Sequence, residues 1–232
     1  MILKKYILFF VIVPVWASAQ NRQIVDATMG EDLSGKVSDQ MKYLFPEFTT
    51  GDVYYFDIPK SKGKLNYNML LGEMQFLEND QIFTLANVNN VDFVNIENRK
   101  FYRFNDMEFV EELMSTGTTQ LRVRRKGNAV PHSKRGGYGT ESSTEAISSY
   151  TGISSSDSYF NLSVKGKVLI SIDYYYYLIG ANGRYVLIKN VKTFTRQFPS
   201  YRTQIKVFVK EHNTRFNNED DLKVLLEYCS KF

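Results

Sequence analysis

Short apolar runs with a period of two residues are the feature that most restricts how this chain can fold. From residue 51 to residue 126, each run is a few residues long and is separated from the next by Gly, Pro, Asn, Asp or Lys. The runs are DVYYFDI, KLNYNM, EMQFL, QIFTLANV, VDFVNI, KFYRF, EFVEELM and QLRVRRK. This rhythm is typical of a meandering antiparallel sheet. We therefore predict a mainly β protein, with an antiparallel meander over residues 20–126 that forms a sandwich or an incomplete barrel.

The segment KLNYNMLLGEMQF indicates a strand with one apolar face and one face that carries amides. Side chains two positions apart in a strand lie on the same face. We therefore expect Tyr67 and Met74 in the core and Asn66 and Asn68 on the polar face, where the amides are either solvated or bind a ligand. Gly72 interrupts the alternation, which predicts a tight turn or a bulge.

The run KVLISIDYYYYLIGANGRYVLIKNV gives the clearest strand signal in the chain. Asn182-Gly183 favours positive φ angles in a tight turn, so the flanking runs should form a hairpin. One face of the first strand should belong to the core; it consists of Val168, Ile170, Ile172, Tyr174 and Tyr176. The other face includes Tyr175 and Tyr177, for which two interpretations stay open. The rings either pack beneath another element or stack on a sugar or a peptide.

Helical spacing begins after Phe198-Pro199. Apolar residues of the segment SYRTQIKVFVKEH recur at intervals of three and four, which predicts a helix. Asn217 or Asn218 can cap a second helix, whose first turn is acidic. We therefore expect a C-terminal α-helical hairpin. Cys229, the only cysteine, falls on the inner face of the second helix; it is interpreted as a buried, inert thiol, with a disulfide between chains as the alternative.

Residues 127–161 break the strand pattern. Ser, Gly and Thr dominate this stretch, which predicts a long flexible loop before residues 162–232. We expect residues 162–232 to pack with the meander as one unit. Basic residues gather around the start of the loop: Arg122, Arg124, Arg125, Lys126, Lys134 and Arg135. They are a candidate site for a phosphate or a carboxylate-rich polymer. The alternative is a solvated strand end that discourages edge-to-edge association.

Residues 1–19 have the pattern of a secretory signal peptide. Two lysines precede an apolar run from Tyr6 to Trp16, and Ala17-Ser18-Ala19 follows. The run is shorter than the about 20 residues that a membrane span needs. We therefore expect cleavage after Ala19, no transmembrane span thereafter, and a periplasmic, extracellular or cell-surface location. Without the two lysines, 27 basic residues stand against 25 acidic ones, a balance that does not favour nucleic acid as a partner.

Three segments, GDVYYFDIP, KLNYNMLLGEMQF and IFTLANVNNVDFVNI, together with the closing helical segment, resemble a group of uncharacterised exported proteins of Bacteroidota-type bacteria. The resemblance covers about residues 50–126 and roughly the last 65 residues. It implies export, and it carries over no catalytic residue.

The sequence offers little support for catalysis. His132 and His212, the only histidines, show no paired metal-ligand spacing, and no G-x-S-x-G elbow is present. Glu111 and Glu112 are adjacent, so on a strand they point to opposite faces. We therefore expect no cofactor, no metal and a non-catalytic role in binding or assembly, with a glycan, a lipid headgroup or a protein of the envelope as partner. The alternative is a hydrolase acting on an envelope glycan or peptide, because two carboxylates can pair through space.

Overall fold

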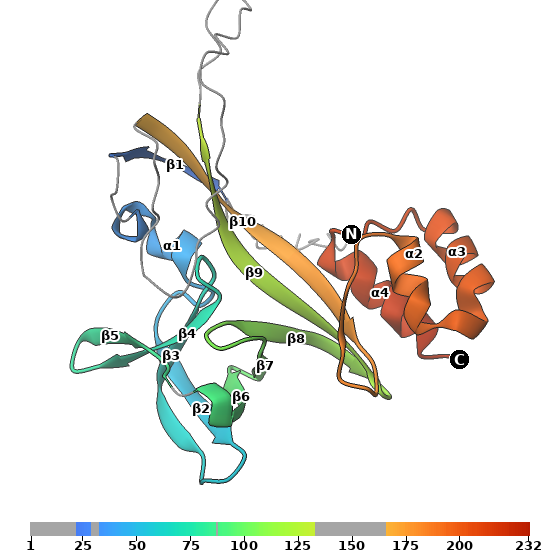
Figure 1. The fold of residues 1–232 in the computed structure, drawn as a ribbon, viewed down its shortest axis with the longest axis horizontal. Helices are drawn as coiled ribbons and strands as arrows, with labels where there is room; N and C mark the ends of the chain where they lie inside the picture. Colours follow the sequence, from blue (N-terminus) through green and yellow to red (C-terminus); the bar gives the residue numbers. More distant parts are fainter. Residues whose placement is uncertain (1–21, 29–32, 87, 133–165) are drawn as a thin grey trace, which may run out of the picture.

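A computed structural model describes residues 22–28, 33–86, 88–132 and 166–232 of the chain. The described part is mainly β, with a helical C-terminal segment (Figure 1). Its strands are β1 (Arg22–Ala27), β2 (Thr49–Tyr55), β3 (Ser61–Asn68), β4 (Glu73–Glu78), β5 (Gln81–Thr84), β6 (Val91–Ile96), β7 (Arg99–Arg103), β8 (Phe109–Thr116), β9 (Thr119–Pro131), β10 (Gly166–Ile179) and β11 (Tyr185–Leu187). The predicted fold class is confirmed.

All of these strands belong to one antiparallel sheet that does not close on itself. The order across the sheet is β1-β10-β9-β8-β7-β6-β2-β3-β4-β5, and β11 pairs with the end of β10. Most neighbours in space are also neighbours in the chain, as short turns between alternating runs require. Of the two expected architectures, a single curled and open sheet corresponds to the incomplete barrel rather than to two stacked sheets.

The curl of the sheet brings the turn between β3 and β4 against β8. Phe109 N–H donates a hydrogen bond to Gly72 O at 2.7 Å. Gly72 has a φ of +76°, a left-handed conformation that glycine adopts at little cost, so the predicted turn at this glycine is confirmed. The concave side encloses a first hydrophobic core, in which Tyr67, Phe101 and Phe109 are completely buried. Met74 is also completely buried, as expected.

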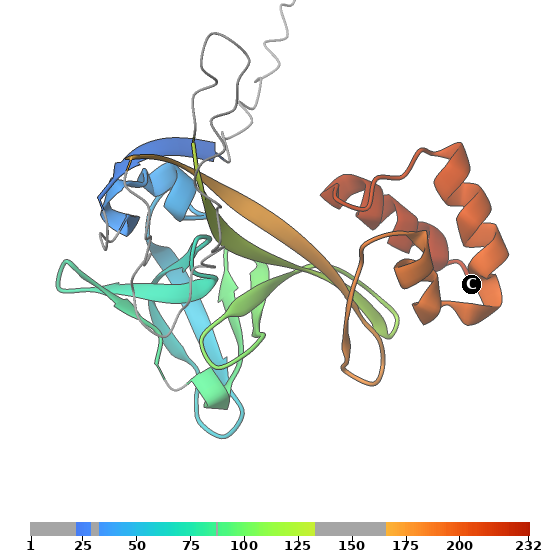
Figure 2. The ribbon, with the colours of Figure 1, turned by 45° about the horizontal axis from the view of Figure 1, so that its top comes forward.

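The helical segment packs on the far half of the β9–β10 ribbon, as Figure 2 shows. The helices of the described residues are α1 (Asp39–Lys42), α2 (Val191–Phe194), α3 (Arg202–Glu211) and α4 (Glu219–Cys229), with short 3-10 turns at Ser34–Lys36, Val88–Asn90, Thr195–Gln197 and Pro199–Tyr201. A second hydrophobic core forms between these helices and the sheet, and Ile205 and Leu222 are completely buried in it. The predicted helical hairpin corresponds to α3 and α4.

The hairpin around Asn182-Gly183 is confirmed. Residues 177–179 of β10 pair with residues 185–187 of β11, and Gly183 has a φ of +67°. The predicted core face of β10 serves both cores, because Val168, Ile170 and Ile172 lie in the first and Tyr176 in the second. Cys229 is buried and free, and burial raises the pKa of its thiol to about 12, as the inert-thiol interpretation requires.

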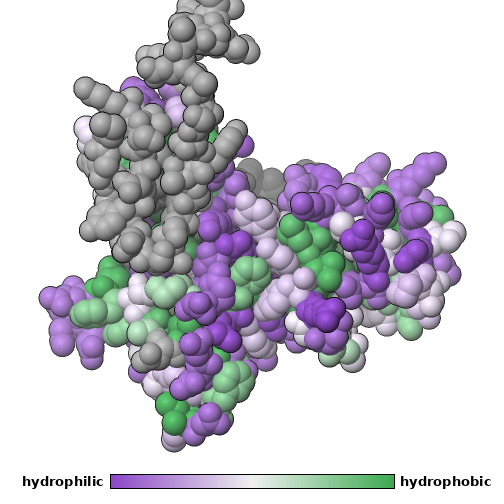
Figure 3. All heavy atoms as spheres, viewed as in Figure 1, coloured by the Kyte–Doolittle hydropathy of each residue, from purple (hydrophilic) through white to green (hydrophobic). Residues whose placement is uncertain are grey.

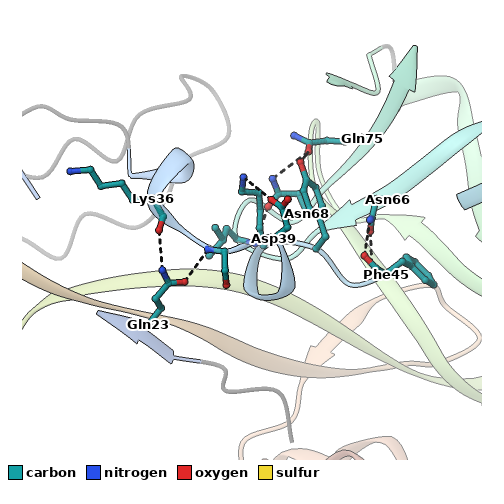
Figure 4. A network of polar contacts seen from close by, with 11 residues as sticks. Gln23, Lys36, Asp39, Phe45, Asn66, Asn68 and Gln75 are labelled. Atoms are coloured by element: carbon teal, nitrogen blue, oxygen red, sulfur yellow. Dashed lines mark hydrogen bonds and ion pairs between the residues drawn. The ribbon is translucent and has the colours of Figure 1, made fainter. Parts of the chain in front are cut away.

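The expectation that Asn66 and Asn68 lie on a polar, ligand-accessible face is wrong. The side chain of Asn66 is 1% exposed, accepts from Phe45 N at 3.2 Å and donates to Phe45 O at 2.9 Å (Figure 4). Asn68 is 3% exposed and accepts from the N–H of Leu70 at 3.1 Å. Both faces of β3 are therefore buried here, one by the first core and the other by the segment that includes α1.

The start of the predicted loop needs correction, and one strand was not predicted. The sequence predicts that the flexible loop begins at Gly127, but β9 continues to Pro131 and pairs with β10 throughout residues 127–131. The remainder of the predicted loop, residues 133–161, lies outside the described residues, as does the predicted signal peptide. In addition, residues 22–27 form β1, which the apolar pattern did not indicate and which pairs with residues 166–171 of β10.

Candidate functional site

Two groups of residues that the sequence indicated separately meet on one face of the sheet. In the pairing of β9 with β10, Arg122 lies opposite Tyr177 and Arg124 lies opposite Tyr175. Because side chains two positions apart share a face, all four lie on the outer face, away from the cores on which Tyr174 and Tyr176 pack. Arg122 and Arg124 of the candidate cationic site therefore share one surface with the candidate stacking site.

The outer face continues across β2, β6 and β7 as a row of aromatic rings. Tyr54 lies opposite Phe93, and Phe93 lies opposite Tyr102. The rings of Tyr54 and Phe93 stack, with centroids 4.3 Å apart and planes inclined by 16°, and the centroids of Phe93 and Tyr102 are 5.8 Å apart. We define the aromatic–cationic row as Tyr54, Phe93, Tyr102, Arg122, Arg124, Tyr175 and Tyr177.

At the β2 end of the row, ammonium groups lie over the rings. Lys60 Nζ is 5.2 Å from the centroid of Tyr54, and Lys100 Nζ is 5.4 Å from the centroid of Phe93. Lys60 also pairs with Asp52 at 3.4 Å. Both lysines are exposed and both rings are half-buried. A ligand can therefore contact ring faces and positive charge together at this end.

The middle of the row is closed by its own side chains. The guanidinium of Arg122 lies 3.7 Å from the ring centroid of Tyr102 and donates to the hydroxyl of Tyr185. Tyr177 contacts Phe104 and Tyr185, with centroids 5.3 and 5.8 Å away. Arg122 and Tyr177 are each only 8% exposed. The packing interpretation therefore describes Tyr177, whereas Tyr175 stays half-exposed at the other end of the row.

The charges of Arg124 and Lys126 are compensated within the fold. Arg124 Nη2 lies 2.5 Å and Lys126 Nζ 3.3 Å from the two carboxylate oxygens of Glu108. Glu108 is 3% exposed and also accepts from Asn105 Nδ2 at 3.0 Å. Arg124 and Lys126 of the basic cluster therefore share one buried carboxylate as counter-charge. The cluster carries less unpaired positive charge than the sequence indicates.

Arg125 lies on the opposite face from Arg124 and takes no part in the row. Its Nη1 is 2.6 Å from Glu111 Oε2, and Arg99 Nε is 2.5 Å from Glu111 Oε1. Burial by itself would raise the pKa of Glu111, but the hydrogen bond from Arg99 and the charges of Arg125 and Arg99 outweigh it and hold that pKa below its ordinary value of 4.5. Arg125 and Glu111 thus form a structural ion pair. Lys134 and Arg135 lie outside the described residues.

Two buried carboxyl groups, those of Glu73 and Glu108, bear on the hydrolase alternative. Glu73 of β4 and Glu108, which directly precedes β8, form an isolated antiparallel bridge, and both are 3% exposed. Burial chiefly raises the pKa of Glu73, the hydrogen bond from the Thr84 hydroxyl at 3.2 Å opposes that shift, and Glu108 adds to it. A carboxyl group that stays protonated above its ordinary pKa is what general acid catalysis requires.

The residues that sequence reasoning missed are Tyr54, Phe93, Tyr102, Lys60 and Lys100. Their aromatic members do alternate with core residues in VYYF, DFV and FYR, so their strand face was readable. Which strands lie side by side was not readable, and only that pairing aligns the three rings.

Comparisons with protein-family models, with curated proteins and with solved structures give no match to this chain. Within residues 22–28, 33–86, 88–132 and 166–232, no helix is long and apolar enough to cross a bilayer. The same residues contain no cluster of three or more His, Cys, Asp or Glu side chains that could hold a metal ion.

Proposed function

We propose that this is an exported, non-catalytic protein of the cell envelope, located in the periplasm or at the cell surface, with a role in binding or assembly. The observation that supports it best is the β2 end of the aromatic–cationic row, where stacked Tyr54 and Phe93 lie beneath Lys60 and Lys100. Flat rings bind the apolar faces of sugars, and ammonium groups bind carboxylates and phosphates. The ligand class that fits is therefore an anionic envelope glycan.

The surface of the molecule agrees with a polar ligand. Figure 3 shows hydrophilic and hydrophobic residues mixed over the visible face, with separate small apolar areas. Binding by a few ring faces and charges does not need a large apolar patch.

Affinity electrophoresis in gels that contain acidic envelope polysaccharide tests the proposal. Phe93→Ala and Lys100→Gln should each lose most of the retardation, by about tenfold in apparent affinity, because each removes one contact of about 1–2 kcal/mol. The matched controls Phe232→Ala and Lys206→Gln lie elsewhere on exposed surface, outside both proposed contacts, and should migrate like the wild type. Equal retardation of all variants would refute the row as the binding site.

Intact-mass analysis of the exported protein should find Gln20 as its first residue.

A hydrolase acting on an envelope glycan or peptide is the second candidate, favoured by the raised pKa of Glu73 beside Glu108. Incubation with purified envelope distinguishes the two. If the protein is a hydrolase, the wild type releases soluble fragments and Glu73→Gln does not. If it only binds, neither the wild type nor Glu73→Gln releases fragments.

A further inference from the structure

One edge of β10 lacks a partner along part of its length. β1 pairs with residues 166–171 and β11 with residues 177–179, and no described strand pairs with the residues between them on that edge. Ile188 N–H donates to Tyr176 O at 2.8 Å, so Tyr176 directs its backbone groups to this edge. Alternate residues of an antiparallel strand do the same, so Ile172 and Tyr174 present N–H and C=O groups there. We call residues 172–176 the β10 slot.

A pocket of about 560 Å³ adjoins this slot. It lies between β10, the residues that follow β11 and the turn before α4. Its lining residues are Tyr174, Tyr175, Tyr176, Leu187, Ile188, Lys189, Phe216 and Asn217. Unpaired backbone groups beside an aromatic pocket are the two elements of strand-addition sites, where the backbone gives affinity and the pocket takes a side chain.

The other end of the same sheet carries a strand with the complementary property. β5 is the last strand in the order, and the β4–β5 hairpin projects from the body of the sheet (Figure 1). Leu85 N–H donates to Met74 O at 2.8 Å, so the odd-numbered residues of this strand direct their backbone N–H and C=O groups to β4. Ile82 and Thr84 therefore direct their backbone groups to the free edge. Ile82 and Phe83 are 50% and 42% exposed.

We propose that the β4–β5 hairpin of one copy adds to the β10 slot of a second copy. Ile82 and Thr84 match Tyr174 and Ile172 in number and spacing, so antiparallel pairing would form four backbone hydrogen bonds. Side chains of directly paired residues share a face. Ile82 then lies on the face of Tyr174 and Phe83 on that of Tyr175, and both tyrosines line the pocket. The exposed apolar side chains of β5 become buried.

The proposed contact joins two different surfaces, so it is head-to-tail. A pair of copies keeps one free hairpin and one free slot, and repetition gives either a closed ring or a growing filament. Of the residues of the aromatic–cationic row, the contact involves only Tyr175, which lies at the opposite end of the row from Tyr54 and Phe93, the rings proposed to bind glycan. Glycan binding and self-association can therefore fail independently.

Sedimentation velocity of the exported, processed protein over roughly 1 to 100 μM tests this. The wild type should associate as concentration rises, whereas Ile82→Lys, which places a charge on the hairpin edge, should stay monomeric. Val207→Lys is the matched control, because Val207 is equally exposed, at 50%, but lies on α3. It should associate like the wild type.

Tyr174→Glu should abolish association from the slot side. Should it lower the melting temperature, Asn217→Trp fills the pocket from an exposed loop position instead. Neither the Ile82→Lys protein nor the slot variant can self-associate, but a mixture of the two should form a one-to-one dimer, because the mixture retains one intact hairpin and one intact slot. A wild type that stays monomeric, an Ile82→Lys protein that still associates, or a mixture that forms no dimer overturns the proposal.

Discussion

Asn66 shows how a buried amide can hold two segments of the chain together. Its side chain accepts from Phe45 N and donates to Phe45 O, and it also accepts from its neighbour Tyr67 N at 2.8 Å. Asn66→Ala should lower the free energy of unfolding by about 2–4 kcal/mol, since it leaves buried backbone groups without partners. Chemical denaturation measures this, with Lys64→Ala, an exposed position of the same strand, as the control expected within about 0.5 kcal/mol. Equal effects for the two would contradict the burial of Asn66.

Glu111 should make stability depend on pH. Its pKa in the folded protein lies below the ordinary 4.5, so its stabilising contribution is present above about pH 4.5 and is lost as the pH falls through the folded value. Glu111→Gln should cost about 3–5 kcal/mol at pH 7, because it leaves the buried guanidinium of Arg125 without its counter-charge.

The difference between wild type and Glu111→Gln should therefore shrink as thermal unfolding is measured from pH 7 down to about pH 3. Glu112→Gln is the control, because the neighbouring side chain lies on the other face of β8 and is half-exposed. A difference that stays constant with pH would show that folding leaves the pKa of Glu111 unchanged, which contradicts the ion pair with Arg125 and Arg99.

At the scale of the element, α4 depends on a single cap. Asn218 Oδ1 accepts from Asp221 N at 2.9 Å, which satisfies one of the free N–H groups of the first turn. Asn218→Ala should lower the free energy of unfolding by about 1 kcal/mol. Asn217→Ala is the adjacent control, because the sequence allows either asparagine to be the cap. It should have little effect, since the capping hydrogen bond is made by Asn218. Urea unfolding followed by circular dichroism measures both free energies of unfolding. A larger decrease for Asn217→Ala than for Asn218→Ala would show that Asn218 is not the cap.

At the scale of the whole molecule, the two parts on either side of residues 133–165 are held together by the sheet. We expect trypsin to cut first at Lys134 or Arg135, because these lie in the polar, Gly/Ser-rich stretch, whereas Lys126 is paired within β9. The two fragments should co-elute in size-exclusion chromatography and separate only in denaturant, since β10 pairs with both β9 and β1. Fragments that separate without denaturant, or a first cut inside β9 or β10, would contradict this.

The local structure of this protein follows from short stretches of its sequence. Alternating runs, the turns at Gly72 and Gly183, and the three- and four-residue spacing around Ile205 were sufficient to predict strands, hairpins and the helical hairpin, because each depends on the periodicity and backbone preferences of neighbouring residues. The strand face of Arg122 and that of Tyr177 could be read in the same way. Contacts between distant residues could not.

The burial of each face and the contacts between distant residues depend on how the strands pair in the folded chain. The segment before β2 covers the amide face of β3, which the alternating pattern predicted to be polar and accessible. Glu108, directly before β8, and Glu111, within β8, neutralise Arg124 and Arg125 of the basic cluster. Pairing of β2, β6 and β7 aligned the aromatic row, and β1 joined β10 without an apolar signal of its own. Strand partners and ion pairs join residues far apart in the chain, and a periodic pattern records only which way a side chain points, not what it meets.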